Sequence, residues 1–226
     1  MSKAGEEVVV HYSRERWNLF KKIRLKAYKI MSCFEEYGIK TIVFGSVARG
    51  DVTKTSDIDI VIPYRISSAI VENILYLSGF SILRKEIVKA TPLHSFKAYL
   101  YIEEKVVISF PLEELSFLER EFYRFGGELN LRGIKEDKRV PGVDKRLMFI
   151  QPIKDGHIEF SIIGRESEVA DRLGVSLQIV LEREKVLLKR KTYGRTGVYV
   201  KRILLPFQSI EEELEKLMKK TSKRKP

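Results

Sequence analysis

"VFGSVARGDVTKTSDIDIVI", residues 43–62, is the stretch that decides the fold of this chain. It places a Gly-Ser pair at the end of one apolar run and two aspartates, Asp57 and Asp59, in and beside the next. Aspartate is a poor strand former, and Ile and Val are good ones. Two carboxylates at these positions therefore indicate that the side chains bind a ligand rather than pack in a core.

Two side chains at i and i+2 of a strand share one face, about 6.5–7 Å apart along the chain. Unpaired carboxylates there would repel each other and be costly to bury, so a positive charge is expected beside them. A divalent cation meets this need, because Mg²⁺ prefers oxygen ligands and is held by a few carboxylates with waters and substrate phosphates. Taken singly, each feature also fits an ordinary turn or a loop cap.

The Gly-Ser pair, Gly45 and Ser46, predicts the other half of the site. A strand that ends in Gly-Ser and turns into a helix presents backbone N–H groups and a hydroxyl to an anion, and glycine lets a phosphate approach the backbone closely. Arg49 and Lys54 in the following loop would add positive charge. Together these residues predict a phosphate site next to a metal site.

Gly45-Ser46, a basic loop with a second glycine, and Ser56-Asp57-Ile58-Asp59 resemble the signature of the DNA polymerase β-type nucleotidyltransferase superfamily. The resemblance implies a helix and a short twisted sheet that hold an NTP over the first 110 to 125 residues. Gly45 and Ser46 would bind its phosphates, with Arg49 and Lys54 as further nucleotide-binding candidates. Asp57 and Asp59 would be the catalytic residues and the ligands of divalent metals, Mg²⁺ or Mn²⁺, that promote displacement of pyrophosphate.

The sequence departs from the family pattern at one position. Active members carry a third carboxylate on a neighbouring strand, and the corresponding segment here, "KVVISF" at residues 105–110, contains no acid. Ile108 or Ser109 stands where an aspartate is expected. Four acids flank this segment, each more simply a solvated turn or helix-start residue: Glu103, Glu104, Glu113 and Glu114.

The apolar pattern of the first half predicts an α+β domain. Helical spacing covers residues 13–37, and β-branched runs at 39–44 and 58–62 read as strands. The remaining elements of this half are expected to be helices at 67–76 and 112–125 and strands at 80–90, 94–102 and 105–110. We therefore expect a nucleotidyltransferase-type mixed sheet with flanking helices in residues 1–125.

The second half, residues 126–226, is expected to form a smaller basic domain that begins with the polar, turn-rich segment 128–145. It has 23 Lys and Arg against 15 Asp and Glu, and so carries +8 of the net charge of +11. A basic half suggests contact with a polyanion, most often nucleic acid, although a solvated lysine-rich surface gives the same count.

Residues 165–186 resemble a helix-turn-helix motif, with Ala170 between two close helices, Gly174 in the turn and Val180 packed between the helices. The segment 187–204 reads as a basic hairpin, which together with the motif would make a winged-helix-like domain. Such motifs also serve as plain packing units, and Glu182 would repel phosphate. The nucleic-acid-binding candidates are Gln178, Lys185, Lys189, Arg190, Lys191 and Arg195.

Composition excludes several classes of protein. No apolar run has the length that a membrane span needs, and the N-terminus lacks the pattern of a signal peptide, so we expect a cytoplasmic protein. The single cysteine, Cys33, excludes an internal disulfide framework. Asn and Gln occur three times each while charged residues reach 32%, a balance typical of thermophile proteins.

Two functional hypotheses follow. The first is a Mg²⁺-dependent nucleotidyltransferase that transfers a nucleotidyl group from an NTP to an acceptor, with DNA or RNA as acceptor candidates. The alternative is a DNA-binding regulator whose catalytically degenerate transferase-fold domain senses nucleotide. Either one allows a homo-oligomer or a companion protein, and neither involves a membrane.

Overall fold

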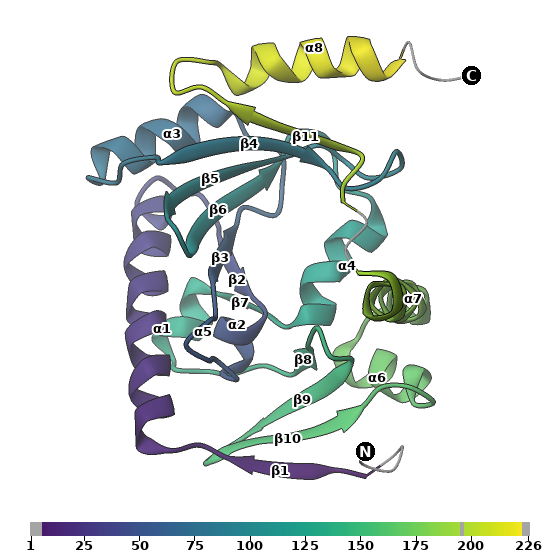
Figure 1. The fold of residues 1–226 in the computed structure, drawn as a ribbon. Coiled ribbons are helices and arrows are strands. Elements are labelled where there is room, and N and C mark those ends of the chain that lie inside the picture. Colours follow the sequence, from purple (N-terminus) through teal and green to yellow (C-terminus); the bar gives the residue numbers. More distant parts are fainter. Residues whose placement is uncertain (1–5, 195–196, 223–226) are drawn as a thin grey trace.

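A computed structural model describes residues 6–194 and 197–222 of the chain. Figure 1 shows two β-sheets, one above the other, with helices around them. The larger sheet has the strand order β11-β4-β5-β6-β3-β2-β7, and the smaller sheet has the order β1-β10-β9-β8. The strands of the larger sheet are β2 (Ile42–Phe44), β3 (Ile58–Val61), β4 (Arg84–Lys89), β5 (Lys97–Glu103), β6 (Val106–Pro111), β7 (Glu128–Asn130) and β11 (Val200–Leu204). Those of the smaller sheet are β1 (Val8–His11), β8 (Gly142–Val143), β9 (Met148–Ile153) and β10 (Gly156–Ser161).

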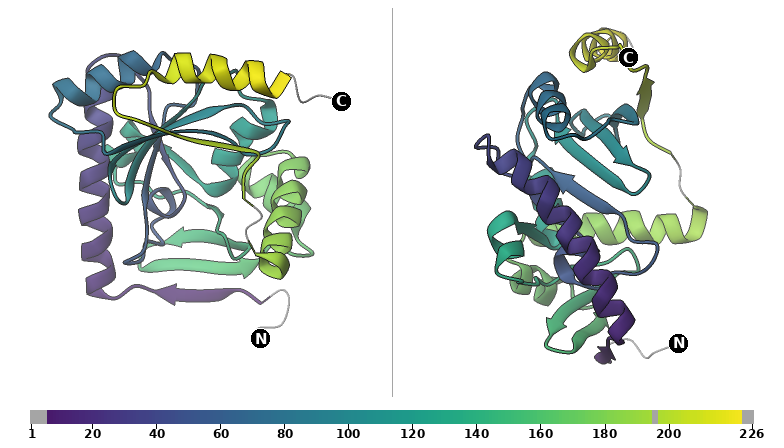
Figure 2. Two further views of the ribbon diagram at one scale, coloured as in Figure 1. Left: turned by 45° about the horizontal axis from the view of Figure 1, so that its top comes forward. Right: turned by 90° about the vertical axis from the view of Figure 1, so that its left-hand side faces the viewer.

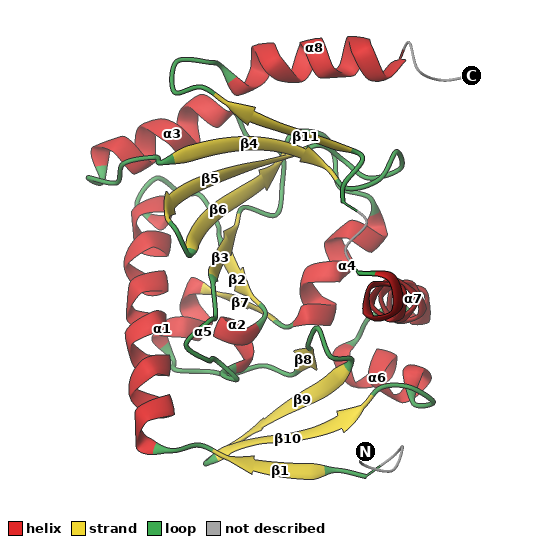
Figure 3. Cartoon of the chain, viewed as in Figure 1, coloured by secondary structure: helices red, strands yellow, loops and turns green. Residues whose placement is uncertain are grey.

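The larger sheet is mixed, because β3 and β6 run parallel while its other neighbouring strands pair antiparallel. Helix α1 lies on one side of the two sheets, and α4 and α7 lie on the other (Figure 3). This arrangement confirms the predicted α+β class, a mixed sheet with flanking helices. Among the described helices, none combines the length and the apolar content that crossing a bilayer requires.

Helix α1 (Arg14–Glu35) forms the main cover of the larger sheet. Ser13 caps its first turn by accepting a hydrogen bond from the amide of Arg16, and its apolar face, which includes Phe20, Ile30 and Phe34, is buried in the core. Arg24 on the same face is buried, and its guanidinium donates to three backbone carbonyls. The predicted helix at residues 13–37 is confirmed.

The C-terminal helix α8 (Ile210–Ser222) lies beside α3 (Ser68–Leu77) at the outer end of the larger sheet (Figure 2). Glu211 accepts hydrogen bonds from the Ser68 amide at 2.8 Å and the Ser68 hydroxyl at 2.7 Å. A carboxylate at a helix N-terminus satisfies donors that the helix itself cannot pair. The end of the chain therefore caps a helix of its first half.

The basic hairpin predicted at residues 187–204 is wrong. Helix α7 (Leu177–Tyr193) continues through the first part of this segment, and β11 pairs antiparallel with β4 rather than folding back on α7. The reason is apolar burial, because Leu204 packs into the core of the larger sheet while β11 completes the edge of that sheet.

The polar segment 128–145 is also more regular than its composition suggested. It forms β7, which pairs with β2, then α5 (Leu131–Lys135) and β8. Three of its apolar side chains, Leu129, Leu131 and Ile134, are buried in the same core as the apolar face of α1. The division of the chain into domains at residues 125 and 126 stays a prediction, and both β7 and β11 add strands to a sheet that the first half begins.

A second core joins the smaller sheet to three helices, α4 (Phe117–Gly126), α6 (Glu166–Leu173) and α7. Gly174, in the left-handed conformation with φ 60°, ends α6, and Ser176 caps α7 by accepting from the amide of Ile179. Ala170 and Val180 are buried between these elements. The assignment of α6 and α7 as a DNA-binding helix-turn-helix motif stays a prediction.

Replacing Gly156 with alanine is expected to lower the free energy of unfolding by about 3 kcal/mol, because overpacking a close contact forces the backbone apart. A Cβ atom at this position would overlap the carbonyl oxygen of Val10 on the neighbouring strand β1. Chemical denaturation measures the change. Lys154→Ala, at an exposed position in the adjoining turn, serves as the control and should leave stability unchanged. Equal stability of the two variants would show that β1 does not pack against β10 as described.

Candidate active site

A cavity of about 880 Å³ lies between the two sheets. Its walls come from the turn after β2, the loop that leads into β3, the end of α4, the strands of the smaller sheet and one side of α7. Six of the predicted site residues line it together: Gly45, Ser46, Arg49, Asp57, Asp59 and Arg190.

Gly45 and Ser46 form the turn from β2 into the short helix α2 (Ser46–Arg49). Gly45 has φ 76° and ψ −144°, a conformation that strongly favours glycine. The Ser46 hydroxyl donates to the hydroxyl oxygen of Ser56 at 3.2 Å, and Ser56 also accepts from the Thr53 amide at 2.9 Å. These bonds tie the turn to the loop that carries the first aspartate.

Asp57 is exposed just before β3, and Asp59 lies within it. Burial, and after it the negative charge of Asp57, raise the pKa of Asp59 to about 6, while the positive charge of Lys145 opposes this rise. Neither carboxylate makes a side-chain hydrogen bond or an ion pair with any described residue. No arginine or lysine neutralises them by direct contact within 6–194 and 197–222.

The third carboxylate is missing from the structure as well as from the sequence. On β6, Val107 lies opposite Asp59 and Ser109 lies opposite Val61. None of the four flanking acids lines this cavity: Glu103, Glu104, Glu113 and Glu114. Over the described ranges, no group of three or more His, Cys, Asp or Glu residues is arranged to hold a metal ion. The donor set for a cation is therefore two carboxylates, which suits an ion that also takes water and phosphate oxygens.

Arg49 and Lys54, the two further nucleotide-binding candidates, differ in their relation to the cavity. The Arg49 side chain is buried, donates to the Gly126 carbonyl at 2.5 Å and forms an ion pair with Asp51 at 2.9 Å. It lines the cavity, but its guanidinium mainly fastens α2 to the end of α4. Lys54 lies in an exposed turn and is not among the residues that line the cavity.

Helix α7 contributes a row of three side chains, two of which the sequence did not single out. Arg183, Leu187 and Arg190 line the cavity, and their spacing of four and three places them on one side of the helix. Of the predicted nucleic-acid-binding residues, only Arg190 belongs to this row. The other described candidates do not line the cavity: Gln178, Lys185, Lys189 and Lys191. Arg195 lies outside the described residues.

His157 on β10 is a cavity residue that sequence reasoning missed. Its Nδ1 atom lies 2.6 Å from the hydroxyl of Tyr12, and its Nε2 atom lies 3.3 Å from a carboxylate oxygen of Glu159. Burial raises the pKa of Tyr12 to about 12 and lowers the pKa of His157, so the phenol donates to a neutral imidazole at neutral pH. The only available signal was the i, i+2 spacing of His157 and Glu159 on one strand.

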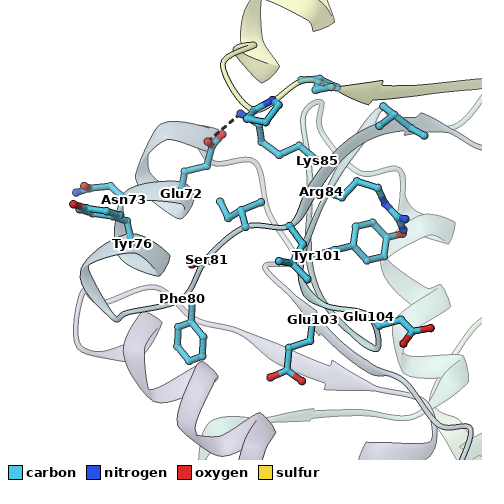
Figure 4. Close-up of a pocket in the computed structure, with 15 residues that line it drawn as sticks. Glu72, Asn73, Tyr76, Phe80, Ser81, Arg84, Lys85, Tyr101, Glu103 and Glu104 are labelled. Atoms are coloured by element: carbon cyan, nitrogen blue, oxygen red, sulfur yellow. Dashed lines mark hydrogen bonds and ion pairs between the residues drawn. The ribbon is translucent and has the colours of Figure 1, made fainter.

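A second cavity, of about 980 Å³, lies at the opposite end of the larger sheet between α3, β4 and β11 (Figure 4). Figure 4 shows the ion pair between Lys85 and Glu72 at its upper rim, with atoms 3.3 Å apart. Its lining also includes apolar side chains such as Phe80 and Ile82. None of the site residues predicted from the sequence lines it, so the first cavity is the candidate active site.

The comparison with protein families agrees with this geometry. Residues 26–167 match the family described as a nucleotidyltransferase domain, and the match covers well over half of the chain. The chain therefore belongs to the nucleotidyltransferase domain family. The matched region includes the Gly-Ser turn, both aspartates and the strands of the smaller sheet except β1. Comparisons with curated proteins and with solved structures gave no match.

Proposed function

We propose that this protein transfers a nucleotidyl group from an NTP to an acceptor hydroxyl and depends on a divalent cation, Mg²⁺ or Mn²⁺. The observation that carries the proposal is the pair of unpaired carboxylates, Asp57 and Asp59, beside the Gly45-Ser46 turn in one cavity. Family membership supports nucleotidyl transfer in general. The cation, the NTP and the acceptor are the proposed part.

The two carboxylates fit a divalent cation because they are oxygen donors that no described residue pairs by a side-chain hydrogen bond or an ion pair. When bound, such a cation neutralises phosphate charge and orients the leaving pyrophosphate. The protein's own groups would position the nucleotide: Gly45 and Ser46 line the cavity on the side of the larger sheet, and His157 lines it on the side of the smaller sheet.

Pyrophosphate release tests this proposal directly. The full chain is incubated with each NTP and Mg²⁺ together with RNA, DNA or no added acceptor, and the acceptor is then analysed by mass. We expect one NTP and one acceptor to give stoichiometric pyrophosphate and an acceptor heavier by one nucleotidyl group. Absence of pyrophosphate with all acceptors and with either Mg²⁺ or Mn²⁺ would contradict the proposal.

One observation favours the alternative of a DNA-binding regulator. Lys185 and Lys189 lie one turn apart on α7, are exposed and are absent from the cavity lining, so they are accessible to a duplex outside it. In that case the transferase-fold domain would bind nucleotide without transferring it, in keeping with the missing third carboxylate. The two functions differ in the residues they require. Nucleotidyl transfer requires the two aspartates, whereas DNA binding by a regulator requires the outer side of α7.

Removing Lys185 and Lys189 tests the nucleic-acid contact. If both side chains contact phosphates, the double alanine variant should bind every DNA or RNA sequence more weakly and reduce the salt dependence of binding by about one unit of slope per lost contact. Gel-shift titrations over a range of salt concentrations measure this. The matched control is Lys21→Ala/Lys22→Ala on α1, which removes the same charge from an exposed helix outside the cavity. Equal slopes for the two double variants would reject a specific role for α7.

A further inference from the structure

The cavity contains more positive charge than its own carboxylates compensate. Six basic side chains line it, and three of them are already engaged: Arg49 with Asp51, Arg146 with Asp144 and Glu159, and Arg16 with the Val52 carbonyl. The other three, Lys145, Arg183 and Arg190, make no side-chain hydrogen bond or ion pair with a residue in the described part of the chain. Lys145 and Arg190 are exposed and Arg183 is half-buried. Cations without partners that together line a cavity are a feature of anion sites.

Arg183 is the most constrained of these cations. Its guanidinium lies 4.9 Å above the ring of Phe122, which also lines the cavity and contacts Phe44. Its Nε atom is buried without a hydrogen-bond partner, an arrangement that costs free energy unless a ligand accepts from it. Burial lowers the pKa of Arg183 and the neighbouring charge of Arg190 lowers it further.

Lys145 and Arg190 complete the wall. Lys145 lies in the turn before β9 and lines the same cavity as Asp59. Arg190 follows Arg183 by two turns on the same side of α7. Under the proposed function a divalent cation balances the two aspartates, which leaves three positive charges facing the cavity. A triphosphate carries about the complementary negative charge.

We propose that Lys145, Arg183 and Arg190 form a binding site for a polyphosphate chain that does not require the metal. Its assignment to the β- and γ-phosphates of the NTP rests on the proposed function, whereas the anion site itself does not. The planar guanidinium of Arg183, fixed on Phe122, offers a fork of N–H donors that matches phosphate oxygens. The nucleotide would thus be held from two sides, by the Gly45-Ser46 turn and by α7.

Inorganic tripolyphosphate in the presence of EDTA is the probe, and isothermal titration calorimetry measures its affinity for the full chain. We expect wild-type binding, and binding at least about tenfold weaker for Arg183→Gln/Arg190→Gln, since each lost charge-assisted hydrogen bond is worth about a factor of ten or more. Glutamine removes the charged guanidinium but keeps a polar side chain at each position. The control is Lys21→Gln/Lys22→Gln, which removes the same charge from α1 and should bind as the wild type does.

The same titration separates this site from the proposed function. Asp57→Asn/Asp59→Asn should bind tripolyphosphate at least as tightly as the wild type without metal, even if nucleotidyl transfer is never observed. Three results would overturn the proposal: no binding by the wild type, equal weakening of the arginine and control variants, or an arginine effect confined to a 5′-hydroxyl oligonucleotide. The last result would assign the cations to a nucleic-acid backbone instead.

Discussion

Asp59→Asn is expected to abolish pyrophosphate release while making the metal-free protein more stable. The activity should fall at least about 10³-fold, because an amide oxygen is a poor replacement for a carboxylate that holds the cation. The stability gain has a separate cause. Burial and the charge of Asp57 raise the pKa of Asp59 to about 6, so ionised Asp59 opposes folding.

The gain in stability of the Asp59→Asn variant is expected at high pH and not at low pH. A carboxyl whose pKa is raised on folding favours the native state when it is protonated, and this contribution is lost as the pH rises through the window from about 4 to about 6. Above that window the asparagine variant should exceed the wild type by up to about 3 kcal/mol, and below it the two should converge. Urea denaturation at pH 4 and pH 7.5, with EDTA present, measures both limits.

Two variants control this experiment. Asp57→Asn, at the exposed end of the pair, should lose activity with a smaller gain in stability than Asp59→Asn, because burial is the larger cause of the raised pKa of Asp59. Glu35→Gln/Glu36→Gln, at an exposed helix end outside the cavity, should change neither. Activity within tenfold of the wild type for Asp59→Asn would exclude Asp59 as a metal ligand. A stability difference that is the same at both pH values would exclude the buried repulsion.

Arg49→Met is expected to cause the largest loss of stability in the molecule, about 3–5 kcal/mol, because it leaves Asp51 buried without its counter-charge. The ion pair joins side chains that are 5% and 8% exposed, so water cannot replace the lost partner. The variant also loses the hydrogen bond to the Gly126 carbonyl, which fastens the Gly-Ser turn to the end of α4. Thermal and chemical denaturation measure the effect.

A double variant identifies the cause of that loss. Arg49→Met/Asp51→Leu removes both charges and should recover much of the stability, since replacing a buried pair by apolar groups is often close to neutral. The exposed pair of Arg132 and Glu136 provides the comparison, and Arg132→Ala should leave stability unchanged. If the double variant were as unstable as the sum of the two single variants, the pair would not be the reason for the loss.

Most of the local structure could be predicted from the sequence because it depends on neighbours along the chain. The three- and four-residue spacing of Trp17, Phe20, Ile23 and Ala27 predicts α1, and the alternation around Asp59 predicts β3. The Gly-Ser turn is equally local, since only its own φ and ψ angles demand glycine. The sequence also shows that residues 105–110 contain no acid. In the structure, Val107 and Ser109 of this segment lie beside β3.

Which helices and strands pack against each other depends on contacts between residues that are far apart in the sequence. Residues 187–204 were expected to form one hairpin, but the burial of Leu204 takes β11 to the far edge of the larger sheet. His157 is an isolated residue in the sequence, and only the pairing of β1 with β10 brings Tyr12 to it. No periodicity within a segment contains that information.

The sequence by itself determined the class of fold and the two aspartates near a Gly-Ser turn, because spacing along a strand or helix sets which side chains share a face. The tertiary structure alone decided which side of α7 meets the cavity. Arg183 and Arg190 look no different in sequence from Lys185 and Lys189, and burial of Ile179 and Val180 against the smaller sheet turns the arginines inward. The orientation of α7 is therefore set by packing between segments, which minimises the exposed apolar surface of the whole chain.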